Sequence, residues 1–141
     1  MKATDKTIIS VQASIQAPIE KVWKLWTTPE DIVNWNNASV DWHTTHAEND
    51  LQVGGKFDYR MEAKDGSMGF DFEGIYSSVN HNNLIEYFII DGRKVVIDFM
   101  ANGNETKIIE SFNAEDINPI ELQRIGWQAI LDNFKKYAEE N

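Results

Sequence analysis

Apolar and polar side chains alternate near the start of the chain. Between residues 7 and 16, the odd positions from Ile9 to Ile15 are apolar, and the even positions from 10 onward are serine or glutamine. This period of two predicts a half-buried β-strand. The apolar spacing then becomes helical, which predicts one short helix after Pro18 and a second after Thr28, whose side chain suits a helix N-cap.

The period of two returns between about residues 40 and 113 and indicates about six further strands. Aspartate–glycine pairs at Asp65 and Asp91, together with the segment 102–104, separate these strands and are typical of hairpin turns. Connections this short join antiparallel strands, because a parallel pair needs a much longer crossover.

A long helix is expected at the end of the chain. Asn118, Pro119 and Glu121 together predict a capped helix start, and helical spacing continues almost to the last residue. Such a helix has about 20 residues and a length of roughly 30 Å. Gly126 is expected to let it approach the sheet closely. Its apolar stripe consists of Trp127, Ile130, Leu131, Phe134 and Ala138.

These elements predict an α+β fold. A sheet with one apolar face needs a cover, and the C-terminal helix is the only expected element long enough to provide it. We therefore expect a curved antiparallel sheet of about six to seven strands, wrapped around the long C-terminal helix, with two short helices after the first strand. The chain has no repeat, linker or change in composition, so we expect a single domain over residues 1–141.

Composition narrows the functional classes. Thirteen basic and 23 acidic residues give a net charge of −10, so nucleic acid and anionic membrane surfaces are poor partners. The absence of cysteine excludes disulfides, thiolate metal sites and a cysteine nucleophile. No apolar run approaches the roughly 18 residues of a membrane span, and no signal peptide is evident, so we expect a cytoplasmic protein.

Six short segments match a known family in the same order along the chain. They are Ala17-Pro18, Lys21-Val22-Trp23, Trp26-Thr27, VGGKF at 53–57, GFDFEG at 69–74 and GWQAILDNF at 126–134. Together they resemble the START-like, or SRPBCC, superfamily, and within it the proteins similar to the C-terminal domain of the activator of heat-shock protein 90 ATPase. The resemblance implies the helix-grip fold, which commonly leaves a cavity between the sheet and the C-terminal helix. The superfamily includes lipid carriers, hormone receptors, polyketide cyclases and co-chaperone domains, so the fold alone does not select a function.

No group of residues predicts a metal site, a cofactor or a catalytic nucleophile. His43 and His46 are three residues apart on an expected strand, and that odd spacing predicts that they lie on opposite faces. His81 lies among asparagines in an expected turn. No serine has the strand–turn–helix setting of a nucleophile elbow, and Gly54-Gly55 lacks the frame of a phosphate-binding loop.

Aromatic residues and one carboxylate are the candidate binding residues. Glu110 shares the side of its strand with Ile108 and Phe112, so it is expected to point inward. Burial would suit it to acid–base chemistry, whereas contact with solvent or pairing with Arg60 or Lys107 would make it structural, and we expect the structural role. The inward rings form either a solid core or the wall of a pocket, and the resemblance favours the pocket. The predicted ligand-binding residues are Trp35, Trp42, Phe57, Tyr59, Phe70, Phe72, Tyr76, Tyr87, Phe99, Glu110 and Trp127.

The leading hypothesis is a non-enzymatic binding protein that holds a small apolar or amphipathic molecule between the sheet and the C-terminal helix. One alternative is a cyclase- or dehydratase-like enzyme in which Glu110 or a pocket tyrosine transfers a proton. The other, which the resemblance implies, is a co-chaperone-like module that binds a chaperone. The resembled co-chaperone has a separate N-terminal domain with no expected counterpart here, so we rank a small ligand above a chaperone partner.

Overall fold

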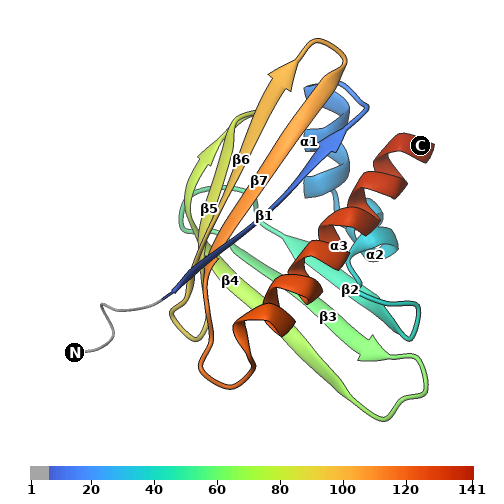
Figure 1. Ribbon diagram of the computed structural model, residues 1–141, viewed down its shortest axis with the longest axis vertical. Helices are drawn as coiled ribbons and strands as arrows, with labels where there is room; N and C mark the ends of the chain where they lie inside the picture. The colour runs from blue at the N-terminus through green and yellow to red at the C-terminus, as the bar shows by residue number, and fades with distance from the viewer. Residues whose placement is uncertain (1–6) are drawn as a thin grey trace.

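The computed structural model describes residues 7–141 (Figure 1). Within this range, no helix is both long and apolar enough to cross a membrane. The described elements follow one another in the order β1 (Ile8–Ile15), α1 (Ile19–Thr27), α2 (Pro29–Trp35), β2 (Trp42–Asn49), β3 (Lys56–Ala63), β4 (Gly69–Asn80), β5 (Leu84–Ile89), β6 (Lys94–Asn102), β7 (Glu105–Asn113) and α3 (Ile120–Glu140).

The strands form one antiparallel sheet in the order β1-β7-β6-β5-β4-β3-β2. From β2 to β7, neighbours in the chain are neighbours in the sheet. β1 lies beside β7, with Ile8 opposite Asn113 and Ile15 opposite Thr106. The sheet is curled, and α3 lies across its concave face with α1 and α2 nearby (Figure 1). The predicted fold class is therefore confirmed, with seven strands in the sheet.

The alternation of apolar and polar residues determines which side chains each strand buries. Val95, Ile97 and Phe99 of β6 are all buried, while the residues between them are more exposed. The register aligns these positions with the buried positions of β7, so that Ile97 lies opposite Glu110 and Phe99 opposite Ile108. One layer of inward side chains thus covers the concave face of the sheet.

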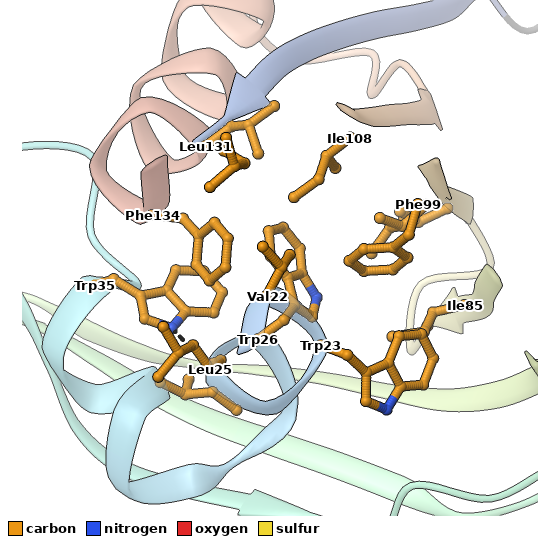
Figure 2. Packing of buried hydrophobic residues seen from close by; sticks show 14 of the residues in the cluster. Val22, Trp23, Leu25, Trp26, Trp35, Ile85, Phe99, Ile108, Leu131 and Phe134 are labelled. Atoms are coloured by element: carbon orange, nitrogen blue, oxygen red, sulfur yellow. Dashed lines mark hydrogen bonds between the residues drawn. The ribbon is translucent and has the colours of Figure 1, made fainter. Parts of the chain in front are cut away.

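An aromatic core fills part of the space between the sheet and the helices (Figure 2). Phe99 of β6 meets Trp23 and Trp26 of α1 edge-on, with ring centroids 5.1 and 5.8 Å away. Phe134 of α3 contacts Trp26 and Trp35 with centroid distances of 4.8 and 4.9 Å. Such edge-to-face contacts favour one arrangement of the rings, and they join all three helices to the sheet.

The helix caps differ from the prediction. α3 begins at Ile120, one residue later than expected, so the Asn118 side chain lies too early to bond the first free N–H groups. Instead, the Gln123 amide donates hydrogen bonds to the carbonyls of Asn118 (2.8 Å) and Glu115 (3.2 Å). Thr28 is the N-cap of α2, but its hydroxyl donates to a carbonyl of α1 (2.6 Å) and makes no cap bond.

Gly126 does not bring α3 close to the sheet. A β-carbon at this position would have no neighbour within 4 Å, so the glycine lies against open space. The close contact is made further along the helix by Leu131 and Phe134, which are fully buried. The expected role of Gly126 is therefore wrong.

Candidate functional site

A cavity of about 290 Å³ lies beside the aromatic core, between α3 and strands β3 to β7. Its wall combines inward side chains of these strands with Trp127 and Ile130 of α3. Trp26 and Trp35 form part of the same wall and also belong to the aromatic core, so they separate the filled space from the hollow one. Met61, Ile85 and Ile97 complete the apolar lining.

The structure places most of the predicted ligand-binding residues around this cavity. Phe99 is an exception because inward side chains at its end of β6 meet α1 and join the aromatic core. Trp42, the first residue of β2, is the other exception and lies against Phe70 with ring centroids 6.0 Å apart. The predicted residues that do line the cavity are Trp35, Phe57, Tyr59, Phe70, Phe72, Tyr76, Tyr87, Glu110 and Trp127.

Phe57 is the centre of the aromatic wall. Its ring centroid lies 4.7 Å from that of Tyr87, 4.9 Å from that of Tyr59 and 5.4 Å from that of Tyr76. The ring rests on Gly74 of β4, where a β-carbon would come within 2.5 Å of it. A side chain at position 74 would therefore push Phe57 toward the cavity. Sequence reasoning missed Gly74, although a glycine inside an alternating strand is a sign of close approach.

Trp127 forms the helical side of the cavity. Its ring stacks on Phe112 with a centroid distance of 3.8 Å and an interplanar angle of 13°. It also meets Phe72 edge-on at 6.2 Å. This half-buried ring thus links α3 to both β7 and β4 at the cavity wall.

Three tyrosines bring hydroxyl groups to the apolar wall. Tyr76 donates a hydrogen bond to the side-chain oxygen of Asn49 (2.5 Å). Burial raises the pKa of Tyr59, Tyr76 and Tyr87 above the ordinary value of a phenol. At neutral pH these groups are un-ionised, and they contribute hydrogen bonds rather than charge.

Glu110 is the only carboxylate-bearing side chain that is buried among the described residues, with 6% of its surface exposed. It lies in β7 between Val11 of β1 and Ile97 of β6 and lines the cavity. Within residues 7–141 its side chain makes no hydrogen bond or ion pair. Burial raises the pKa of the Glu110 carboxyl to about 8. The group is therefore mainly protonated at neutral pH.

The inward position expected of Glu110 agrees with the structure, but both structural explanations expected for it are wrong. The side chain is buried, so it does not reach solvent. Arg60 instead pairs with Glu62 (3.0 Å) and Asp71 (3.5 Å), and Lys107 is exposed. Glu110 is consequently an unpartnered acid in an apolar wall.

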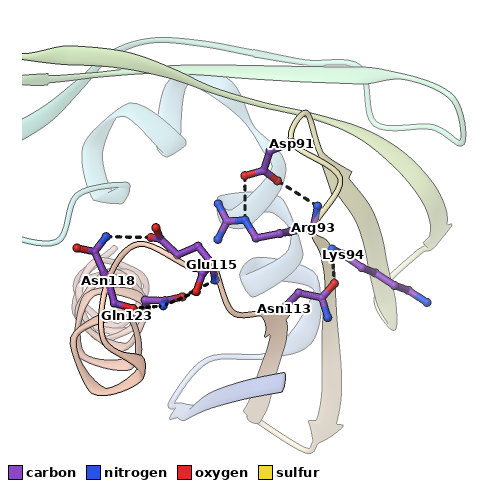
Figure 3. Close-up of polar contacts among 7 residues, drawn as sticks. All are labelled: Asp91, Arg93, Lys94, Asn113, Glu115, Asn118 and Gln123. Atoms are coloured by element: carbon purple, nitrogen blue, oxygen red, sulfur yellow. Dashed lines mark hydrogen bonds and ion pairs between the residues drawn. The ribbon is translucent and has the colours of Figure 1, made fainter. Parts of the chain in front are cut away.

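Arg93 and Glu115 also line the cavity and were missed by sequence reasoning. Arg93 follows a hairpin turn, and its Nε donates to the Asp91 carboxylate (2.9 Å; Figure 3). Glu115 lies between β7 and α3, where its carboxylate accepts a hydrogen bond from Asn118 (3.1 Å; Figure 3). In the sequence both residues belong to ordinary polar loops, and only the curl of the sheet brings those loops to the same cavity.

No three histidine, aspartate or glutamate side chains in the described part of the chain are grouped closely enough to hold a metal ion. The expectation that His43 and His46 lie on opposite faces of their strand is nevertheless wrong. A bulge between Thr44 and His46 shifts the register of β2, so that His43 and His46 lie opposite Glu62 and Arg60. Those two positions share one face of β3.

Comparisons with known proteins agree with this description. The family model of the activator of Hsp90 ATPase homolog 1-like protein matches residues 16–139. The solution structure of an AHSA1-like protein from Aeromonas hydrophila is 45% identical, covers 95% of this chain and 93% of its own, and superposes with a TM-score of 0.89. The solution structure of Chr148 from Cytophaga hutchinsonii is 54% identical, with coverages of 96% and 93% and a TM-score of 0.80.

More distant relatives share the fold. Protein CV1439 from Chromobacterium violaceum is 20% identical, yet its crystal structure covers 96% of this chain and 99% of its own with a TM-score of 0.85. At this identity the likeness concerns the fold alone. No curated protein matches the sequence.

Proposed function

The chain belongs to the activator of Hsp90 ATPase homolog 1-like family, and on that premise we propose that it binds a small, mostly apolar molecule between the sheet and α3 without transforming it. The observation that carries this proposal is the aromatic-lined cavity. Its volume of about 290 Å³ lies just below the roughly 300–1,000 Å³ typical of small-molecule sites. A ligand with one ring or with two fused rings suits this space.

The apolar wall supports binding of this kind. Contacts with aromatic and aliphatic side chains supply most of the affinity in small-molecule pockets, and a few polar groups orient the ligand. Here the polar groups are the tyrosine hydroxyls and Glu110 inside the cavity, with Arg93 and Glu115 from its flanking loops.

Two isoleucines of α3 allow a matched test. Ile130 lines the cavity, whereas Ile125 is 58% exposed and does not. We expect the larger side chain of Ile130→Phe to fill part of the cavity. The dissociation constant of 2-ethylnaphthalene should then rise at least about tenfold, which corresponds to a loss of roughly 1.4 kcal/mol of binding free energy. The dissociation constant is measured by titration of the amide NMR spectrum.

Ile125→Phe should bind 2-ethylnaphthalene like the parent, and thermal unfolding should show that both variants are folded. Equal affinity in the parent and the folded Ile130→Phe protein would contradict binding in this cavity. Native mass spectrometry of the purified protein then identifies the natural ligand.

A second function is favoured by Glu110. A buried carboxyl that is protonated at neutral pH is suited to general acid catalysis, as in a cyclase or dehydratase. If the protein is such an enzyme, incubation with a metabolite extract should deplete a compound, and Glu110→Gln should slow that depletion about a hundredfold or more. Depletion at the same rate by the variant would eliminate this role for Glu110.

A further inference from the structure

We propose that the ligand is uncharged and carries a carbonyl or similar acceptor oxygen, to which the Glu110 carboxyl donates a hydrogen bond inside the cavity. This inference rests on the proposed function, because it names the chemistry of the molecule that the same cavity takes. It assigns to Glu110 a role in ligand recognition.

Glu110 lies at the cavity without a partner from the described part of the chain. Val11 and Ile97 flank it on the two neighbouring strands, and the residue lines the cavity. Within residues 7–141 it has no hydrogen-bond partner. Buried polar groups in folded proteins are almost always paired, so a buried carboxyl without a protein partner beside a hollow space is paired with what occupies that space, and an acceptor atom of a ligand can replace water there.

The groups around Glu110 favour its protonated form. The titratable or charged groups that share the cavity are Tyr59, Tyr76 and Tyr87 on β3 to β5, together with Arg93 and Glu115 from the two loops. The tyrosines are un-ionised, and Arg93 is paired with Asp91. Among residues 7–141 no cation forms an ion pair with Glu110, and in its protonated form the carboxyl has one O–H donor to offer.

The charges around the cavity argue against a charged ligand. An anionic ligand would lose its hydration in an apolar wall. The only cationic side chain that lines the cavity in the described part of the chain is Arg93, which is already bonded to Asp91 and accompanied by Glu115. An amine would take the Glu110 proton and leave a buried ion pair, whose desolvation is costly. A neutral acceptor oxygen brings no charge into the cavity and leaves the proton on Glu110.

Three ligands of similar shape separate these cases. We compare 2-acetylnaphthalene, 2-ethylnaphthalene and 2-naphthoate at pH 6 with the parent protein, with Glu110→Leu, which removes the donor, and with Glu110→Gln, which keeps a donor but does not titrate. The preference is the dissociation constant of the ethyl compound divided by that of the acetyl compound. We expect the parent and Glu110→Gln to show at least about ten times the preference of Glu110→Leu.

The pH supplies an independent readout. Raising the pH from 6 to 9.5 ionises Glu110, so the preference of the parent should fall while that of Glu110→Gln stays constant. A preference that is equal in the parent and Glu110→Leu, or tighter binding of 2-naphthoate than of the ketone, would overturn the inference. The proposed function fails separately, when Ile130→Phe leaves the affinity for 2-ethylnaphthalene unchanged.

Discussion

At the scale of single residues, Glu110 is the position where the proposed function and stability oppose each other. Its neighbours in the sheet are apolar, and an apolar residue there would avoid the cost of burying a carboxyl. A side chain that is unfavourable for folding and faces a cavity is characteristic of functional sites. The same burial makes the stability of the protein depend on pH.

Glu110→Gln should remove that dependence. Because the carboxyl has a pKa of about 8 in the folded state, against an ordinary value of 4.5 for an exposed glutamate, the folded protein binds one more proton than the unfolded chain between these values. The free energy of unfolding therefore falls as the pH rises, by up to about 1.4 kcal/mol per pH unit, and the loss ends above pH 8. The free energy of unfolding of Glu110→Gln, relative to that of the parent, should therefore increase by roughly 2–4 kcal/mol between pH 5 and pH 8.

Denaturant unfolding at pH 5, 6.5 and 8 measures this difference. Glu140→Gln, which makes the same chemical substitution at an exposed position of α3, is the control and should run parallel to the parent. Parallel profiles for the parent and Glu110→Gln would mean that the carboxyl is ionised in the folded protein.

At the scale of elements, α3 has two parts with different tasks. Its second half buries Leu131, Phe134 and Ala138 and seals the aromatic core. Its first half carries Trp127 and Ile130 to the cavity wall. Substitutions in the two halves should therefore affect stability and ligand binding in different proportions.

Trp127→Ala tests the first half. The ring stacks on Phe112 but borders open space, so its loss should cost about 2–3 kcal/mol, less than the roughly 3–5 kcal/mol of a fully buried tryptophan. Binding of 2-ethylnaphthalene should weaken as well. Ile125→Ala on the exposed face of the same helix should change the unfolding free energy by less than about 0.5 kcal/mol. A loss as small for Trp127→Ala would place its ring outside the packed structure.

At the scale of the whole molecule, the sequence predicts the strands well because burial of one face imposes a period of two on each of them. It predicts the caps poorly, since a shift of one residue at Asn118 replaces one set of hydrogen bonds by another. The bulge beside His46 is a similar local shift.

For the candidate site, too, the sequence predicts some features and not others. Alternation indicates that Phe57, Tyr87 and Phe99 point inward, but it does not indicate where along the concave face each one lies. Phe99 meets the tryptophans of α1, whereas Phe57 and Tyr87 border the hollow part. Arg93 and Glu115 are brought together by the curl of the sheet, which no local pattern encodes.

The pairing of β1 with β7 has a consequence for the newly made chain. Ile15 pairs with Thr106, and at roughly 5–20 residues per second the ribosome needs on the order of 5–20 s to synthesise the segment between them. During this interval β1, which carries the apolar residues Ile9 and Val11, has no partner strand, and an unpaired strand edge invites association with other chains. β1 is thus synthesised well before the strand that pairs with it, so a nascent chain is most exposed to misassembly before residue 113 has emerged.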